Sequence, residues 1–276
     1  MAEETPSDWP HPSCYVIHEV GVAAHEQTVT VHAEYGLILV LDGWFTMEQR
    51  YEALSTSGSV TIVPAGVPHR PLAGENINYW LLGFTASSFG FEESQAIMRP
   101  FSEVRLGAAP VIKLTDSAIE RLTDLFERLH KEVSLQTAES TDVQRSLITL
   151  ILAEAGRSSP PATEGSQTSS LVSKALRYIQ QNSLTPISLA DVAEAVGRSR
   201  PHVASVVKAE TGFTVGTWIT SARVAKAAQL LEHTELTIDQ IAPLIGWQDT
   251  THFIRQFRKI YGVTPASWRK GKKSSI

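Results

Sequence analysis

An internal repeat in the last third of the chain constrains its fold most strongly. The segment ISLADVAEAVG, residues 187–197, aligns without gaps with LTIDQIAPLIG, residues 236–246. Each copy begins with a Ser or Thr suited to cap a helix, continues for about two turns and stops at a glycine. A short turn and a second capped helical segment follow each copy, opened by Ser199 and by Asp249. This order of elements is typical of a helix-turn-helix.

The residues around the two copies predict two further helices. The segment VGTWITSARVAKAAQLLEHT, residues 215–234, fits one longer helix between the copies, and residues 171–182 fit a leading helix. The expected inward-facing residues of the longer helix are Trp218, Ala222, Ala225, Leu230 and Leu231. Two recognition helices held about 34 Å apart would enter successive major grooves on one face of a DNA duplex. The alternative interpretation is a plain helical bundle, which the duplication disfavours.

Charge is divided unevenly along the chain. Residues 166–276 hold 14 Lys/Arg and 7 Asp/Glu, a balance of +7, whereas residues 1–165 hold 10 Lys/Arg and 22 Asp/Glu, a balance of −12. A basic domain on an otherwise acidic chain is a cue for binding to a polyanion. The charge pattern therefore supports double-stranded DNA as the partner of the repeat.

The cysteine count and the hydropathy exclude several classes of protein. Cys14 is the single cysteine, which excludes an intrachain disulfide and a thiolate-rich zinc site. No apolar run approaches the roughly 18 residues of a membrane span, and the acidic N-terminus lacks the apolar core of a signal peptide. We expect a cytoplasmic protein that does not contact a membrane.

A change of composition predicts where the chain divides. Residues 154–170, EAGRSSPPATEGSQTSS, are rich in Ser, Pro, Gly and Thr and show no apolar period, as in a linker. The predicted fold class is therefore α+β with two domains. We expect a sheet-rich domain over residues 1–156, a linker over 157–169 and an all-α domain over 170–276.

The first domain shows strand patterns followed by two helical patterns. The run GLILVLDGWF predicts a buried strand, a turn at Asp42-Gly43 and a second strand, and GSVTIVPAGVPHRP and INYWLLGF are further strand-like runs. Residues 116–134 predict an amphipathic helix capped by Asp116, and residues 141–155 predict a second helix. The second helix is more apolar than one buried face requires, so it either completes the core of the domain or forms a homodimer interface.

The basic domain resembles the DNA-binding domain of the AraC/XylS family of bacterial transcription regulators. The resemblance covers residues 168–270 and is most specific in IAPLIGWQDTTHFIRQFRKIYGVTPASWR. That segment ends in the pattern G-x-TP-x-x-[YW]-R at Gly262, Thr264, Pro265, Trp268 and Arg269. The resemblance implies a sequence-specific regulator, more often an activator, that acts on RNA polymerase in the bacterial cytoplasm at the nucleoid.

The resemblance also assigns DNA contacts. In the second unit, Phe253, Phe257 and Ile260 hold the recognition helix to the domain. Arg255 is the strongest candidate for bidentate binding to guanine. The candidate base contacts are Arg200, Pro201, His202, Ala204, Ser205, Thr250, Thr251 and Arg255. The candidate phosphate contacts are Ser199, Lys208, Thr237, Arg258 and Lys259. Among the candidate base contacts, those of the first unit include Pro201, Ala204 and Ser205. Their small side chains cannot form bidentate pairs with a base.

Pro243 is unusual because it falls inside a short predicted helix, where it costs a backbone hydrogen bond. We expect a distorted or 3₁₀-like turn at that position.

The acidic domain resembles a cupin barrel. The segment GSVTIVPAGVPH, residues 58–69, fits the second cupin motif, G-x5-P-x-G-x2-H, and EYGLILVLDGWF is similar to the end of the first motif. The H-x-H metal pair of cupin enzymes is absent, with Thr30 in place of the first His and only His32 and Glu34 nearby. A metal needs three or four aligned ligands, so we expect no metal, no cofactor and no catalytic residue.

In AraC-type proteins such a barrel binds a small effector or mediates dimerisation. The candidate effector pocket comprises His25, His32, Tyr35, Trp44, His69 and Trp80. The leading hypothesis is a DNA-binding transcription regulator modulated by a small molecule. The alternatives are a constitutive DNA-binding regulator whose barrel only dimerises, and a cupin enzyme with a helical appendage.

Overall fold

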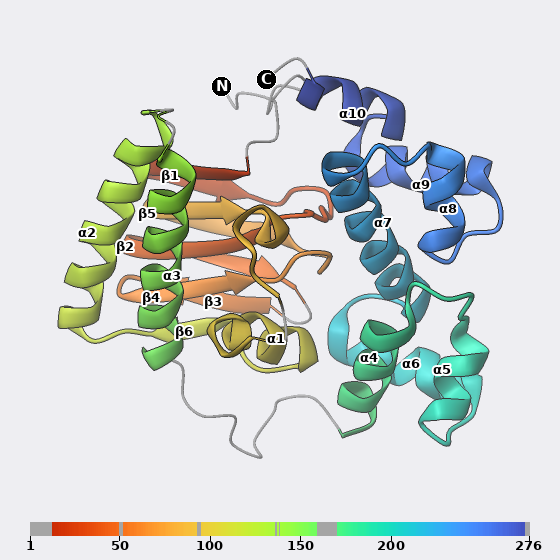
Figure 1. Cartoon of the computed structure of the whole chain (residues 1–276). Helices are drawn as coiled ribbons and strands as arrows, with labels where there is room; N and C mark the ends of the chain where they lie inside the picture. Colours follow the sequence, from red (N-terminus) through yellow and green to blue (C-terminus); the bar gives the residue numbers. More distant parts are fainter. Residues whose placement is uncertain are drawn as a thin grey trace.

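The computed structural model describes residues 13–49, 52–92, 95–135, 137, 139–158 and 170–273, which form a sheet-rich domain and a helical domain (Figure 1). The strands are β1 (Cys14–His25), β2 (Tyr35–Glu48), β3 (Glu52–Thr56), β4 (Ser59–Val63), β5 (Arg70–Phe84) and β6 (Val111–Lys113). The helices are α1 (Arg99–Leu106), α2 (Asp116–Val133), α3 (Ser140–Ser158), α4 (Ser170–Asn182), α5 (Leu189–Ala195), α6 (Arg200–Thr211), α7 (Val215–His233), α8 (Ile238–Leu244), α9 (Thr250–Tyr261) and α10 (Pro265–Lys273), with short 3₁₀ helices at Ala86–Phe89 and Ala96–Met98. The predicted α+β class is confirmed.

The predicted domain boundaries fall largely on residues that the structure does not describe. α3 continues to Ser158, two residues beyond the predicted end of the first domain. Residues 159–169 lie outside the described residues, and they make up nearly all of the predicted linker. The boundaries therefore stay a prediction.

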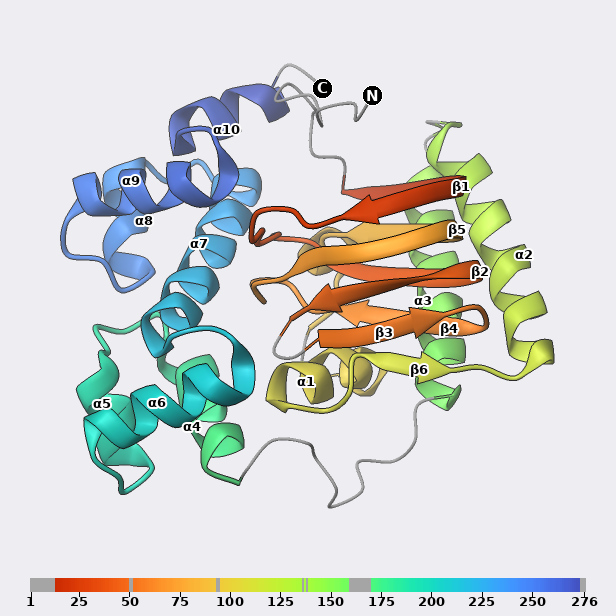
Figure 2. The same ribbon diagram turned by 180° about the vertical axis from the view of Figure 1, so that it is seen from behind.

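The sheet is antiparallel, with strand order β1-β5-β2-β4-β6, and β3 pairs with β2 beside this path. β2 is central because it pairs with β5 along its whole length, with β4 through its first half and with β3 through its second half. Helices α2 and α3 lie against one side of this sheet (Figures 1 and 2). The sheet and its helices share one core that includes Leu37, Leu82, Phe126, Ile148 and Leu152.

The prediction of a turn between two strands at Asp42-Gly43 is wrong. β2 runs through both residues without interruption. The register between β2 and β5 shifts on either side of Asp42, which marks a bulge. Gly43 has φ +73°, and a Cβ there would lie 2.3 Å from the carbonyl oxygen of Asn76. The Asp-Gly pair therefore bends a continuous strand at the point where its partner changes from β4 to β3, instead of closing a hairpin.

The cap predicted for α2 is wrong by one residue. The N-cap is Thr115, whose hydroxyl accepts a hydrogen bond from the amide of Ala118 at 3.3 Å, and Asp116 is the first helical residue. Asp116 remains favourable there because an acidic residue in the first turn interacts well with the helix dipole. Thr and Asp both suit this boundary, so the sequence pattern alone did not distinguish them.

Two loops of the sheet domain reach into the helical domain. Val67 is 2% exposed and belongs to the core formed by α4, α5, α6 and the start of α7. Ala33 is fully buried in the core formed by α7 to α10. The loops are joined to each other, because the amide of Gly66 donates to the carbonyl of His32 at 2.8 Å. Gly66 lies directly on α7, since a Cβ there would be 3.1 Å from the Cβ of Ala225.

Within the described residues, none of the helices combines the length and the apolar character needed to cross a membrane.

Candidate nucleic-acid interface

The helical domain contains two helix-turn-helix units built on α7. Unit 1 is α5 and α6, and unit 2 is α8 and α9. α7 fills the predicted position between them almost residue for residue. α8 and α9 lie beside the C-terminal part of α7 on the side away from the sheet domain, whereas α5 and α6 lie at the N-terminal end of α7 (Figures 1 and 2). The helices predicted from the repeat are confirmed as elements.

Matching caps explain why both units fold in the same way. Ser188 and Thr237 each form a capping box, with Asp191 and with Gln240 respectively. These reciprocal bonds satisfy backbone donors that a helix N-terminus leaves unpaired. The hydrogen bonds from Ser188 lower the pKa of the Asp191 carboxyl. The first helix of each unit then ends before a glycine with positive φ, Gly197 at +63° and Gly246 at +81°.

The repeat also extends further than the aligned segments suggest. Gly212 and Gly262 end α6 and α9 in left-handed conformations, and a capped helix follows each of them. Thr214 caps α7 by accepting from the amide of Thr217. Thr264 accepts from the amide of Ser267 in the same way at the start of α10. Each following helix carries a tryptophan that is 4% exposed, Trp218 in α7 and Trp268 in α10.

α9 divides cleanly into a buried face and an exposed face. Phe253 and Phe257 are fully buried in the core of unit 2, and Ile260 packs against it. Thr251 and Arg255 are exposed, and Thr250 is half-buried. The side chain of Asp249 accepts a hydrogen bond from the amide of Thr251 at 2.8 Å, which confirms the predicted cap. The candidate base contacts of unit 2 are therefore accessible.

α6 has the same division but carries different chemistry. Val203 and Val207 are fully buried, at the positions equivalent to the two phenylalanines of α9. The candidate base contacts Arg200, Pro201, His202 and Ser205 are exposed, and Ala204 is half-buried. Ser199 occupies the N-cap position without a hydrogen bond from its side chain to the helix. The exposed face of unit 1 thus combines small side chains with one arginine and one histidine.

The candidate phosphate contacts are also at the surface. Ser199, Lys208, Thr237, Arg258 and Lys259 are all exposed. Lys208, Arg258 and Lys259 lie in the last turns of α6 and α9, where a cation also interacts favourably with the helix dipole. The roles of the individual side chains at DNA stay predictions.

The turn of unit 2 contains a residue that sequence reasoning missed. Residues 245–249 separate α8 from α9, whereas residues 196–199 separate α5 from α6. Unit 2 therefore has one extra turn residue. Trp247 in this turn is 6% exposed, and its ring stacks on Phe253 at 5.4 Å between centroids. A large aromatic residue in a turn is unusual enough to have signalled a buried contact.

Pro243 lies near the end of α8. The helix continues as an α-helix to Leu244, and its last turn tightens, because the amide of Gly246 bonds to the carbonyl of Pro243 at 3.2 Å. This i→i−3 bond is of the 3₁₀ type expected from the sequence. The side chain of Pro243 is exposed.

The candidate effector residues of the sheet domain occupy different environments. His25 and His32 are exposed and Trp44 is half-buried. Tyr35 is buried between Phe84 and Phe101, with centroid distances of 5.6 and 5.0 Å. The structure thus places part of this set in packed interior and part at the surface.

Trp80 and His69 are the other buried members. The Trp80 ring stacks on that of His18 at 4.0 Å. Burial, assisted by neighbouring His32, lowers the pKa of His69 to about 3. His69 is therefore neutral at pH 7. Its Nδ1 lies 2.9 Å from the carbonyl oxygen of Val67, so Nδ1 carries the proton and donates it to that oxygen.

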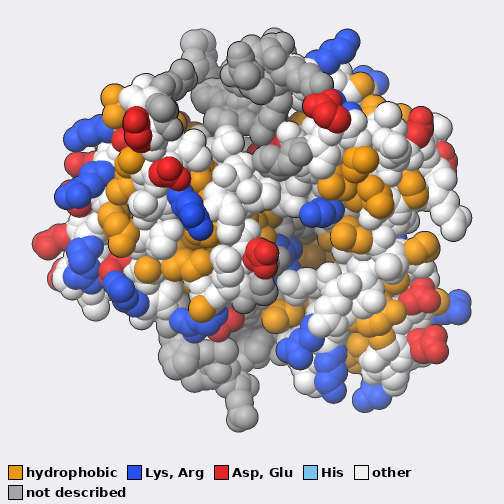
Figure 3. Space-filling view, in the orientation of Figure 1, with side chains coloured by type: hydrophobic (Ala, Val, Ile, Leu, Met, Phe, Trp, Pro, Cys, Tyr) orange, Lys and Arg blue, Asp and Glu red, His pale blue; other side chains and the backbone are white. Residues whose placement is uncertain are grey.

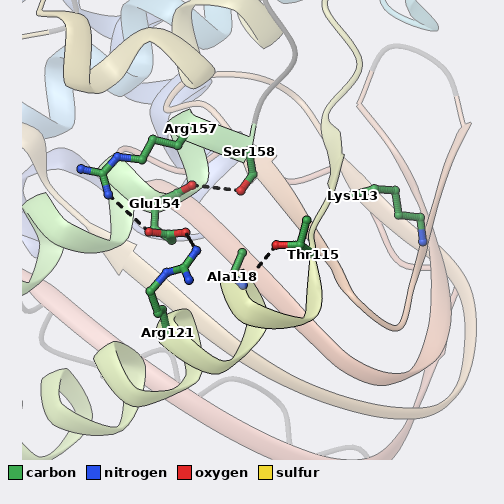
Figure 4. A pocket seen from close by; sticks show the side chains of 7 residues that line it. All are labelled: Lys113, Thr115, Ala118, Arg121, Glu154, Arg157 and Ser158. Carbon is green, nitrogen blue, oxygen red and sulfur yellow. Dashed lines mark hydrogen bonds and ion pairs between the residues drawn. The ribbon is translucent and has the colours of Figure 1, made fainter.

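Neither of two hollows in the described structure is lined by those candidate effector residues. The larger, of about 390 Å³, lies among β6, α2 and α3 (Figure 4). There Arg121 and Arg157 both point at Glu154, at 2.6 and 3.4 Å. The bond from Arg121 lowers the pKa of the Glu154 carboxyl. The Arg121–Glu154 pair thus ties α2 to α3, whereas Arg157 lies on α3 beside Glu154.

The smaller hollow lies between the two domains, where Figure 3 shows the surface recessed. It is lined by Gly66 and Arg105 of the sheet domain and by residues of α4 and α7. Its volume of about 20 Å³ is that of a single water molecule. No group of three or more His, Cys, Asp or Glu side chains suited to a metal occurs among the residues that the structure describes.

Comparison with known proteins finds relatives of the helical domain. A model described as a helix-turn-helix domain matches residues 192–271. The regulatory protein PocR of Salmonella typhimurium is 34% identical over 101 residues, which are 37% of this chain and 33% of PocR. The xylose operon regulatory protein of Escherichia coli is 33% identical over 104 residues, covering 38% of this chain and 26% of that protein.

Two further proteins are similar to this chain, one over the same domain and one over most of the chain at lower identity. The transcriptional activator NphR of a Rhodococcus species is 36% identical over 95 residues, covering 34% of this chain and 28% of NphR. Among solved structures, ToxT of Vibrio cholerae aligns with 94% of this chain and 98% of its own length, at 12% identity and a TM-score of 0.45. The aligned segment thus spans a third or less of the curated relatives PocR, NphR and the xylose regulator. The helical domain, with its two helix-turn-helix units, is thus similar to a helix-turn-helix domain of known transcription regulators over residues 192–271.

Proposed function

We propose that this protein is a sequence-specific regulator of transcription that binds double-stranded DNA through α6 and α9. The observation that carries the proposal is the shared design of the two helices. Each buries its apolar residues against its own unit and presents polar or basic side chains to solvent. A helix held in this way fits the major groove of B-DNA, where base edges present a distinct pattern of donors and acceptors.

Charge supports the same partner. Lys208, Arg258 and Lys259 are exposed at the ends of the two helices and lie in the chain segment with a net charge of +7. Contacts between such cations and phosphates release counterions, so affinity falls as salt rises. These side chains set affinity, whereas Arg255 and its neighbours on α9 set sequence preference.

Activation of transcription through RNA polymerase, and a homodimeric state, complete the proposal. Exposed apolar residues on α3 support the dimer, because Val143 is 40% exposed, Leu150 is 53% exposed and Leu147 lies half-buried between them. These residues follow i, i+4, i+7 spacing and form one stripe on the helix. A second copy of α3 would cover this stripe.

Control of DNA binding by a small effector in the sheet domain is the first of two candidate forms of this function. Tyr35, His69 and Trp80 pack into the interior of the sheet domain. This packing favours the second candidate, a constitutive DNA-binding regulator whose sheet domain contributes to assembly. The two candidates differ in one measurable way, because only the first predicts that a metabolite changes DNA affinity.

The test is selection of DNA by the purified full-length protein from a random duplex pool, followed by titration of an enriched duplex at several salt concentrations. We expect enrichment of a common sequence and a linear fall of log K with log salt, with a slope of about −0.9 per phosphate contact. Arg258→Ala is the matched variant and should reduce the slope by about 1. Failure to enrich any sequence, or affinity independent of salt, would contradict DNA binding.

A further inference from the structure

A single buried arginine joins the two helix-turn-helix units. Arg223 lies in the middle of α7 and is 7% exposed. Its Nε donates to the carbonyl oxygen of Ser183 at 2.7 Å, and its Nη2 donates to that of Thr185 at 2.7 Å. Both carbonyls lie in the segment that leads from α4 into unit 1. The guanidinium also lies 5.5 Å from the ring centroid of Trp247, in the turn of unit 2.

The turn of unit 2 is shaped around this contact. A Cβ on Gly246 would lie 3.0 Å from Nε and Nη2 of Arg223 and 2.8 Å from the carbonyl oxygen of Thr185. The backbone of the turn therefore packs directly on the guanidinium and on its acceptor. Gly197, the equivalent glycine of unit 1, has no atom within 4 Å of a Cβ placed there. The extra turn residue, Trp247, covers the guanidinium from the side of unit 2.

The position of Arg223 along α7 explains why a link is needed there. Val215, Trp218 and Ile219 of α7 belong to the core of unit 1. Val224, Ala227 and Ala228 of the same helix belong to the core of unit 2. The two units are thus attached to successive parts of one helix by separate apolar cores. Arg223 lies where one core ends and the other begins.

The guanidinium remains charged in this setting. Burial lowers the pKa of Arg223 from its ordinary value, but an arginine is not deprotonated in proteins. Its charge is stabilised by two carbonyl acceptors and by the face of an indole ring. The planar guanidinium makes these contacts in fixed directions, which a flexible ammonium group does not reproduce.

We propose that Arg223 is a positioning residue that fixes the orientation of unit 2 relative to unit 1. On the proposed DNA-binding function, it thereby determines which spacing of two half-sites the protein accepts. α7 sets the separation of the units along its axis. The contacts of Arg223 restrain the remaining freedom of unit 2 to rotate about its apolar core.

The first test needs no DNA. Ala195→Cys and Leu244→Cys place spin labels at equivalent exposed positions of α5 and α8, and pulsed electron paramagnetic resonance measures the distance between them in the full-length protein. Cys14 is buried, and burial raises the pKa of its thiol to about 12, so it reacts poorly with the label. We expect a narrow distance distribution that broadens in Arg223→Met. An unchanged distribution in that variant would overturn the inference.

Two further variants make the result specific. Lys226→Met removes a half-buried cation from the next turn of α7 and should leave the distribution narrow. Arg223→Lys keeps the charge but not the fixed directions of the donors, and should broaden the distribution to an intermediate extent. If Arg223→Met fails to fold, as judged by circular dichroism, Arg223→Lys decides the question. A wild-type distribution in Arg223→Lys would then contradict the proposal.

The second test uses the duplex enriched by the wild-type protein and derivatives with base pairs inserted between the two contacted stretches. Half a turn of DNA, about 5 base pairs, places the two stretches on opposite faces. We expect the wild-type protein to lose affinity by about tenfold or more on this insertion, and Arg223→Met to discriminate at least about threefold less. Equal spacing profiles would overturn the inference and leave DNA binding intact. If no duplex is enriched, the proposed function fails, and the distance measurement still decides the role of Arg223.

Discussion

The two helix-turn-helix units share one backbone plan but differ in how much each helix is held and in what it presents. α9 is fixed by Phe253 and Phe257 and presents Arg255, whereas α6 is fixed by two valines and presents mostly small side chains. The turn of unit 2 is packed against α7, and the turn of unit 1 is open. The difference shows that the two copies of a duplicated motif can keep one backbone geometry while exposing different side chains.

Removing the buried aromatic anchor should have the largest effect. Phe257→Ala should lower the free energy of unfolding of the helical domain by about 3–5 kcal/mol, because it leaves a large cavity in a fully buried site. The equivalent change in unit 1, Val207→Ala, removes only two methyl groups and should cost about 1.6 kcal/mol. Urea denaturation followed by circular dichroism compares them. Equal losses would show that the two helices are held equally.

The turn glycines should follow in size. Gly197→Ala places a side chain in a left-handed conformation with free space around it, at a cost of about 1–2 kcal/mol. Gly246→Ala adds close contacts with Arg223 and with the Thr185 carbonyl, so its total cost should reach about 3 kcal/mol or more. Thermal denaturation of both variants measures the difference. A Gly246→Ala loss no greater than that of Gly197→Ala would show that the turn of unit 2 is not constrained by α7.

Base readout should be unequal between the units. Arg255→Ala should reduce discrimination between the enriched duplex and random DNA by about 1–3 kcal/mol, because a bidentate arginine–guanine pair is lost. Ser205→Ala in unit 1 removes at most one hydrogen bond and should cost about 1 kcal/mol or less. Competition binding at fixed salt provides both values. Greater loss in Ser205→Ala would reverse the assignment of the reading unit.

The helix caps should give the smallest difference. Asp249→Ala removes the side-chain acceptor of the Thr251 amide and should cost about 1 kcal/mol of stability. Ser199→Ala should cost much less, because Ser199 makes no such bond to α6. Differential scanning calorimetry of the two variants tests this contrast. A cost for Ser199→Ala equal to that for Asp249→Ala would mean that the two caps are equivalent in solution.

The sequence predicted best those features that depend on neighbouring residues. The N-caps at Ser188 and Thr237, the cap at Asp249 and the long helix between the units were all predicted from local patterns, and each is present. At Asp42-Gly43 the pattern was ambiguous, because the same two residues suit a hairpin turn and a bulge. Only strand pairing at a distance distinguishes the two, and it selects the bulge.

Features that depend on contacts between residues far apart in the chain could not be predicted from the sequence. Arg223 bonds to carbonyls 40 and 38 residues away, and nothing in its local pattern indicates burial. Trp247 differs, since a tryptophan in a lengthened turn was visible as an irregularity of the repeat. The candidate effector residues were chosen by side-chain type, but packing decides whether such residues line a cavity. Tyr35 and Trp80 lie in packed surroundings instead.

Hydroxyl-radical footprinting of the full-length protein on its enriched duplex tests the central claim most directly. Two units on one helix should protect two stretches about 10 base pairs apart, centre to centre, on one face of the duplex. The stretch under unit 2 should carry the stronger base preference. A single protected stretch, or two stretches on opposite faces, would contradict the account.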